Sequence, residues 1–263
     1  MNKEKGAFFI SISGCLISTT GSVSPEYYAS LGWLSRRIQA GYMGDYPKII
    51  LCSRKDRSFM EALICLIGVP NFHFWSVIEN GAAIFNPITK EVVLNPKFTP
   101  EKKKVFNKVI RKKRVPKILR EYGSLSLRPE NMVCITLEKN RDSVLATEEL
   151  YKRIRKELAD LIKARIIQVT CFDRAININP AGISKVSGIK FLAELEGIDL
   201  ARSLGIGDSK HDIPFLRRVK LIGCPSNADD ECKKFVKEKR GWVAHRSFAC
   251  GVVDVIKYYS RED

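Results

Sequence analysis

Two carboxylates four residues apart follow a short apolar stretch late in the chain. In the segment 204–216 the apolar run ends at Gly207, and Asp208 and Asp212 come after it. A parallel strand that ends in a tight glycine turn presents its next side chains to the crevice at the carboxyl edge of an open α/β sheet. Carboxylates placed there are suited to holding a hard cation such as Mg²⁺ beside a substrate phosphate. Alternatively, Asp212 simply caps a helix that begins at Ile213.

The composition is typical of a globular protein. The 263 residues allow one large domain, or a core with a smaller domain, and they are 45% hydrophobic and 28% charged. No apolar run is long enough to span a bilayer. The apolar run near the N-terminus is interrupted by serines and is not followed by a convincing cleavage site. We therefore expect a cytoplasmic protein.

Eight cysteines are spread singly along the chain, without a Cys-x-x-Cys pair. This spacing argues against a zinc site, and most of them fall in apolar runs, where a reduced cysteine acts as a small core residue. Cys15 and Cys52 alone fall where a site could lie. They could approach each other at the sheet edge, although a redox role is a weak hypothesis.

The formal net charge is +16, which would attract phosphorylated metabolites, nucleic acid or acidic lipids. Much of it lies in the basic segment 102–120, where Val105, Val109 and Ile110 form an apolar stripe at helical spacing and Pro116 should break or kink the helix. One interpretation is a solvated helix face, and the other is an electrostatic platform for a polyanion or a phosphorylated partner. Phe106 is its one aromatic residue, so specific reading of bases is not expected.

Strands and helices alternate at both ends of the chain, which predicts parallel βα units and an α/β fold. We expect strands over 6–16, from residue 47, and over 75–85, the last passing through an Asn-Gly turn. Helices are expected over 24–40, with Ser24 as cap and Pro25 in the first turn, and over 56–67. The rhythm resumes at Ser184 and ends in a helix over 251–259.

The pattern differs over 87–180. Expected strands at 91–94, 132–137, 166–171 and 175–178 and helices at 100–110 and 147–164 predict an antiparallel sheet in a separate α+β module. The predicted division is a core domain of residues 1–86 and 181–263 with an inserted cap domain of residues 87–180.

Four segments occur in the order typical of one phosphatase superfamily. They are Val77-Ile-Glu-Asn-Gly-Ala-Ala, Gly182-Ile-Ser-Lys185, Gly207-Asp208-x-x-x-Asp212 and Pro225-Ser-Asn-Ala. Over nearly its whole length the chain resembles the haloacid dehalogenase superfamily. The similar branch has a large inserted cap and includes sugar-phosphate, sucrose-phosphate and mannosyl-phosphoglycerate phosphatases. The resemblance implies a Rossmann-like, three-layer parallel-sheet core with an inserted α+β cap.

The resemblance also implies a catalytic pair that this chain lacks. The family begins with Asp-x-Asp-Gly-Thr, whose first Asp attacks phosphorus to form an aspartyl-phosphate and whose second acts as general acid and base. Here Ser11 and Ser13 stand at those positions, followed by Gly14 and Cys15. A serine hydroxyl is uncharged at neutral pH, so it replaces a carboxylate neither as a Mg²⁺ ligand nor as a base. Mg²⁺ binding is therefore expected to be weakened or absent.

The other motif positions are retained in part. Cys52 stands where the family has a phosphate-binding Thr or Ser, Lys185 matches the lysine of the third loop, and His211 replaces a usual Asn. The expected ligand-binding residues are Cys52, Ser53, Arg54, Asn80, Lys185 and Asn227, and the expected metal ligands are Asp208 and Asp212. Lys185 could instead pair with Asp208 and close the crevice, Asn80 could be a left-handed turn residue, and His211 could be a solvated loop residue.

Three functions follow as hypotheses. The first is a phosphatase-fold protein without aspartyl-phosphate catalysis, a pseudophosphatase retained for phosphate-ligand binding, regulation or scaffolding, with a phosphorylated small molecule or an unknown protein as partner. The second is an active Mg²⁺-dependent sugar-phosphate-type hydrolase with an unusual nucleophile or a displaced acid such as Glu138, Asp142 or Asp173. The third is binding of a polyanion such as nucleic acid by the basic cap.

Overall fold

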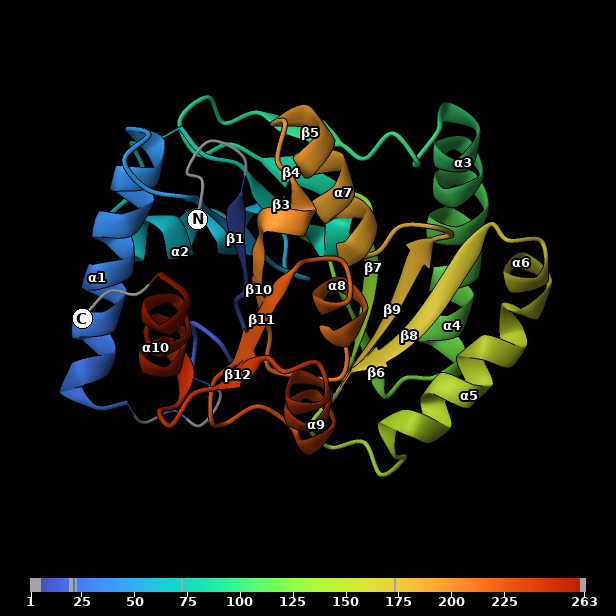
Figure 1. Cartoon of the computed structure of the whole chain (residues 1–263). Coiled ribbons are helices and arrows are strands. Elements are labelled where there is room, and N and C mark those ends of the chain that lie inside the picture. The colour runs from blue at the N-terminus through green and yellow to red at the C-terminus, as the bar shows by residue number, and fades with distance from the viewer. Residues whose placement is uncertain (1–5, 19–20, 22, 72, 173, 261–263) are drawn as a thin grey trace.

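The computed structural model describes residues 6–18, 21, 23–71, 73–172 and 174–260 and contains two sheets (Figure 1). The first half of the core comprises β1 (Ala7–Ser11), α1 (Pro25–Tyr42), β2 (Lys48–Cys52), α2 (Arg57–Leu66), β3 (Ser76–Ile78), η1 (Glu79–Gly81), β4 (Ala83–Phe85) and β5 (Val92–Leu94). The second half comprises α7 (Lys185–Leu195), η3 (Leu200–Arg202), β10 (Leu204–Ile206), α8 (Ile213–Leu216), β11 (Leu221–Cys224), α9 (Asp230–Glu238), β12 (Trp242–Val243) and α10 (Phe248–Ser260).

The core sheet has the strand order β12-β11-β10-β1-β2-β3-β4-β5, and β12 through β3 are parallel. All five residues of β1 are buried, as expected for a central strand covered on both faces. Phe8 and Ile10 pack in the layer that contains α1, α2 and α10, whereas Ala7 and Phe9 pack in the layer that contains α7, α8 and α9. The predicted three-layer α/β core is confirmed.

The expectation of one strand over 75–85 is wrong. The chain reverses at η1, where Glu79 and Asn80 have φ values of 45° and 56°, so β3 and β4 pair antiparallel. The assignment of strand 91–94 to the cap is also wrong, because β5 pairs with β4 at the edge of the core sheet. Val92 and Leu94 pack against one core layer and Val93 against the other, which explains why this segment stays with the core.

The inserted cap contains a second, antiparallel sheet with the order β6-β7-β9-β8, as predicted. Its elements are α3 (Pro100–Val105), the π-helical segment η2 (Phe106–Arg114), α4 (Val115–Glu121), β6 (Leu125–Arg128), β7 (Ile135–Lys139), α5 (Thr147–Glu157), α6 (Ala159–Lys163), β8 (Ile167–Phe172) and β9 (Ala175–Pro180). The helices bury their apolar residues against this sheet (Figure 1). Strand β6 was not predicted, and the helix expected over 147–164 is divided at Leu158.

The helix that begins at Pro100 does not end at Pro116, contrary to the expected break. It continues through η2 into α4 and reaches Glu121. A proline lacks a backbone N–H and is tolerated in the first turn of a helix, and Pro116 falls in the first turn of α4, directly after the π-helical register. Within the described part of the chain, no helix has the length and apolarity required to cross a membrane.

Candidate active site

A cavity of about 530 Å³ lies at the carboxyl ends of the central core strands. Strands β1, β2 and β10 are parallel neighbours, so the loops that follow them meet at one edge of the sheet. All ten predicted site residues line this crevice: Ser11, Ser13, Cys52, Ser53, Arg54, Asn80, Lys185, Asp208, Asp212 and Asn227. The sequence therefore identified the position of the crevice, and the contacts below show what each side chain does there.

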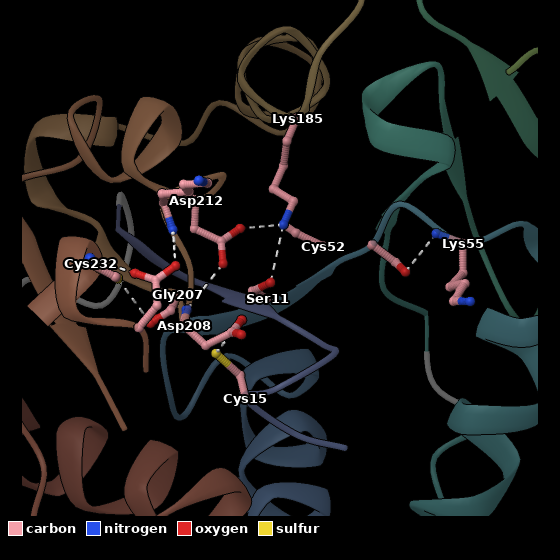
Figure 2. A network of polar contacts seen from close by, with 12 residues as sticks. Ser11, Cys15, Cys52, Lys55, Lys185, Gly207, Asp208, Asp212 and Cys232 are labelled. Atoms are coloured by element: carbon pink, nitrogen blue, oxygen red, sulfur yellow. Dashed lines mark hydrogen bonds and ion pairs between the residues drawn. The ribbon is translucent and has the colours of Figure 1, made fainter. Parts of the chain in front are cut away.

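Lys185 occupies the centre of the crevice, between the first strand and the loop after β10 (Figure 2). Its ammonium donates to the Ser11 hydroxyl over 3.1 Å and to Oδ1 of Asp212 over 2.5 Å. These three side chains are only 2–8% exposed. The alternative in which Lys185 pairs with Asp208 is wrong, because its ion-pair partner is Asp212.

Asp212 precedes α8, but its carboxylate does not cap that helix. Its second oxygen instead accepts the backbone N–H of Asp208 over 3.0 Å. Burial alone would raise the pKa of Asp212, but the Lys185 ammonium and these hydrogen bonds outweigh it and hold the pKa below its ordinary value. Asp212 is therefore an ionised carboxylate with both oxygens occupied by protein groups.

Asp208 reaches back over the turn after β1. Gly14 has φ of 79°, and a Cβ at this position would lie 2.1 Å from Oδ2 of Asp208, so the close approach requires glycine. The Cys15 thiol donates to Oδ1 of Asp208 over 3.7 Å (Figure 2). Burial, followed by the neighbouring charge of Asp212, raises the pKa of Asp208 to about 7.

The two cysteines near the crevice do not contact each other. Cys15 donates to Asp208, whereas the Cys52 thiol donates to the carbonyl of Ile50 over 3.8 Å. Burial raises the pKa of Cys52 to about 12 and that of Cys15 well above its ordinary value. Both are free, buried thiols, which gives no support to the redox hypothesis.

The loop after β2 supplies neutral donors. Ser53 is buried, and its hydroxyl oxygen accepts the N–H of Lys55 over 2.9 Å, which leaves its own proton available to donate. Asn80 adopts the left-handed conformation predicted for a turn residue, and its N–H donates to the carbonyl of Ser53 over 3.0 Å. The η1 turn is therefore tied by its backbone to the loop after β2, and both Ser53 and Asn80 line the crevice.

The cap contributes Phe172 to the crevice wall, a residue that the sequence did not single out. The guanidinium of Arg54 lies 4.0 Å from the centre of the Phe172 ring, and the His211 ring packs on the same phenylalanine, 4.1 Å away. His211 is exposed but is not merely solvated. Nη1 of Arg54 is buried and has no hydrogen-bond partner among the described residues.

Asn227 lines the crevice, but both ends of its amide hold loops together. It donates to the carbonyl of Gly14 over 2.8 Å and accepts the N–H of Phe248 over 2.7 Å. The third carboxylate of the crevice, Asp229, accepts the backbone N–H groups of Lys210 and Cys232, each over 2.7 Å. Both side chains are thus committed to the positions of the loops.

Glu79 joins the core to the cap, a role that no pattern in the sequence predicts. It is fully buried, and its carboxylate accepts the backbone N–H groups of Met132, Val133 and Cys134 over 2.6, 2.8 and 2.9 Å. Burial raises its pKa, and the three N–H groups act in the opposite direction. A turn of the core therefore holds a loop of the cap through one carboxylate.

The donor set does not fit a resident Mg²⁺ ion. Among the described residues there is no group of three or more His, Cys, Asp or Glu side chains that could hold a metal. The charge of Asp212 is matched by Lys185, so Asp208 is left as the main carboxylate donor, and Ser11 and Ser13 add no charge. Of the candidate displaced acids, Glu138 pairs with Arg128 in the cap sheet and Asp142 does not line the crevice. Asp173 lies outside the described residues.

Comparisons with known proteins agree with this architecture. The family model of haloacid dehalogenase-like hydrolases matches residues 124–255. A phosphoglycolate phosphatase of Methanothrix thermoacetophila is 28% identical over 211 residues, which cover 80% of this chain and 82% of that protein. A phosphoglycolate phosphatase of Methanobrevibacter smithii is 27% identical over 120 residues, and the matched part spans only half of its length and 44% of this chain.

Two solved structures have the same fold over almost the full chain. A haloacid dehalogenase-like hydrolase from Bacteroides thetaiotaomicron superposes with a TM-score of 0.71 at 14% identity, covering 97% of this chain and 99% of that one. The sucrose-phosphatase from Synechocystis, in complex with sucrose and phosphate, superposes with a TM-score of 0.67 at 14% identity, covering 97% and 98%. At this level of identity the likeness concerns the fold, including a core with an inserted cap.

Proposed function

Because this chain belongs to the haloacid dehalogenase-like hydrolases, we propose that it is a phosphatase-fold protein that binds a phosphorylated small molecule but does not hydrolyse it through an aspartyl-phosphate. It would act as a pseudophosphatase in ligand sensing, regulation or scaffolding. The names of its relatives suggest small phosphorylated acids or sugars as the ligand class. The observation that carries the proposal is the Ser11 hydroxyl, which accepts a hydrogen bond from Lys185 at the position of the missing nucleophile.

Ser11 lacks the groups that would turn a hydroxyl into a nucleophile. A serine attacks only when a base removes its proton. Of the carboxylates that line the described crevice, Asp212 is ionised but engaged by Lys185, and Asp229 is engaged by backbone N–H groups. Asp208, whose pKa is raised to about 7, accepts from the Cys15 thiol, whereas the contact of the Ser11 hydroxyl is with Lys185. Ser13 offers no acid or base in place of the second aspartate. Loss of a covalent nucleophile lowers rates by several orders of magnitude, about 10⁶-fold for the serine of a catalytic triad.

The crevice remains suited to an anion. Replacement of two aspartates by serine removes two negative charges that would repel a phosphate. The buried Nη1 of Arg54 has no hydrogen-bond partner among the described residues, and the Ser53 hydroxyl proton is available in the same crevice. A guanidinium pairs strongly with phosphate oxygens. We therefore assign the anion-binding role chiefly to Arg54 and Ser53, with Asn80 at the rim.

A phosphatase assay tests the loss of catalysis. With p-nitrophenyl phosphate and Mg²⁺, we expect the natural protein to give no more turnover than a Lys185→Met/Asp212→Asn variant, in which both members of the buried ion pair are removed together to keep the fold. The Ser11→Asp/Ser13→Asp variant should gain activity by orders of magnitude if the remaining loops are still competent. Turnover by the natural protein far above the control would overturn the proposal in favour of an active hydrolase.

Binding is measured separately, by titration calorimetry with inorganic phosphate. We expect Arg54→Gln to weaken phosphate binding at least tenfold. Arg57→Gln is the matched control, because Arg57 lies in α2, outside the residues that line the crevice. Equal phosphate affinity of the Arg54→Gln variant and the natural protein would remove the binding half of the proposal.

A further inference from the structure

A basic helix of the cap carries half of the net charge of the chain. Residues 101–121 contain ten Lys or Arg residues and two Glu residues, a net charge of +8 out of +16. They form the continuous helix α3–η2–α4, which buries Phe106, Ile110, Val115 and Ile118 against the cap sheet. The helix is therefore firmly seated, and its charges are held at fixed places.

Seven of the ten cations of this helix fall into two groups. Arg114 pairs with Asp160 over 2.6 Å, and Lys117 pairs with Glu157 over 3.2 Å, so these two are neutralised within the cap. Arg111 donates to the backbone carbonyls of residues 131–133 and anchors the helix to the loop that Glu79 holds from the core. These contacts hold the helix against the rest of the cap, and the charges of these three residues are engaged by groups within the cap.

The lysines of the second group do not take part in such contacts among the described residues. Lys103, Lys104, Lys108 and Lys112 are exposed, and none of them makes an ion pair within the described part of the chain. They line a shallow depression of about 710 Å³, with Asn107 and Met132 beside them. We call these four lysines the basic surface. Like charges held side by side repel one another, so an external anion would be stabilised there.

We propose that the basic surface binds the phosphate backbone of double-stranded nucleic acid without reading its sequence. Lysine ammonium groups act as point charges toward phosphates, and counterion release makes such contacts favourable. No aromatic side chain lines the depression, which argues against stacking on single-stranded bases. Met132 is the one large exposed hydrophobic side chain among its lining residues, too little for the hydrophobic centre of a protein interface.

The dimensions are compatible with this partner. The four lysines span residues 103–112, about 14 Å along the helix, and a duplex presents about eight phosphates over that length. None of the four lysines lines the crevice, so phosphate binding in the core and duplex binding on the cap are separable. The inference therefore goes beyond the proposed function and does not depend on it.

The test is fluorescence anisotropy with a labelled random DNA duplex of about 20 base pairs at about 50 to 200 mM NaCl. Four lysine–phosphate contacts predict a slope of log K against log salt of about −3.6, which corresponds to about a hundredfold loss of affinity over this range. The variant Lys103→Gln/Lys104→Gln/Lys108→Gln/Lys112→Gln should lose nearly all of that slope. If it folds poorly, as judged by circular dichroism, Lys104→Gln/Lys108→Gln should lose about half of it.

A matched control separates the basic surface from overall charge. Lys233→Gln/Lys234→Gln/Lys237→Gln/Lys239→Gln removes the same number of charges from α9 and the residue after it, and it should keep the natural slope. Equal weakening by both variants would show attraction by net charge alone and overturn the proposal. Binding to vesicles with about 30% phosphatidylserine but not to the duplex would overturn it in favour of a membrane surface.

Discussion

The crevice of the core and the basic surface of the cap differ in how their lysines are paired and exposed. In the crevice, Lys185 is 8% exposed and is matched by Asp212 and Ser11. On the cap, the lysines of the basic surface (103, 104, 108 and 112) are exposed and have no counter-ion in the described chain. A buried charge must be paired because desolvation is costly, whereas an exposed one is tolerated alone. The comparison shows which charges maintain the fold and which are available to a partner.

The largest loss of stability is expected from breaking the buried ion pair between Lys185 and Asp212. Lys185→Met leaves the Asp212 carboxylate uncompensated in the core and should lower the free energy of unfolding by about 3–5 kcal/mol. Urea unfolding measures it. The double variant Lys185→Met/Asp212→Asn removes both charges and should recover most of the loss. A single variant as stable as the natural protein would mean that the pair is solvated and that the contrast with the cap does not exist.

Removal of the Glu79 carboxylate, which joins the core to the cap, should give the next largest loss in the free energy of unfolding. Glu79→Ala leaves the N–H groups of residues 132–134, two of them in buried hydrogen bonds, without an acceptor, and this should cost about 2–4 kcal/mol. Hydrogen exchange at these amides should accelerate more than exchange in β1. Glu130→Ala serves as the control, because Glu130 is an exposed acid just before the same loop. Unchanged exchange in the Glu79→Ala variant would show that the cap is held by other contacts.

The sequence was informative wherever a function depends on residues close in the chain or on adjacent parallel strands. Ser11 and Asp208 lie in one crevice because the loops after parallel strands meet at the same sheet edge, and Lys185 was assigned to it from the family resemblance. The carboxylate of Glu79 and the ring of Phe172 could not be assigned in this way. Their partners belong to the other domain, and only packing of the cap on the core brings them into contact.

Local patterns also failed where tertiary packing outweighs them. The short strand at Val92–Leu94 lies in sequence beside the cap, but its two faces are apolar and fill both core layers. Pro116 lies inside a helical pattern, and a π-helical register before it lets the helix continue. Neither the strand's destination nor the register is encoded in hydrophobic spacing alone.

Ionisation of Asp208 should have a smaller, pH-dependent effect on the free energy of unfolding. Its pKa in the folded protein is about 7, above the value of about 3.9 for an unfolded chain, so the native state binds more protons between these values. Stability from this group is present at low pH and is lost as the pH rises toward 7. Because Asp208 is partly exposed, the loss should be on the order of 1 kcal/mol.

The Asp208→Asn variant isolates this titration. It cannot ionise, so its stability relative to the natural protein should increase from pH 5 to pH 8, as measured by urea unfolding at several pH values, and level off above pH 8. Ser209→Ala, at the neighbouring crevice position, should leave the pH dependence unchanged. If the natural protein and the Asp208→Asn variant have parallel pH profiles, Asp208 is already ionised at low pH and the crevice is more solvated than its burial indicates.

Substitutions in the basic surface should have the smallest effect on the free energy of unfolding. A small effect is expected because these exposed lysines, unlike Lys185, do not maintain the fold. Neutralising Lys103, Lys104, Lys108 and Lys112 to Gln removes exposed charges without ion pairs, so the free energy of unfolding should change by no more than about 0.5 kcal/mol. Any change should be a gain at low salt that fades at high salt, because relief of like-charge repulsion is screened. Urea unfolding at two salt concentrations measures it. A loss above about 2 kcal/mol would mean that these lysines stabilise the cap fold itself. In that case weakened duplex binding by the same variant could no longer be attributed to lost phosphate contacts.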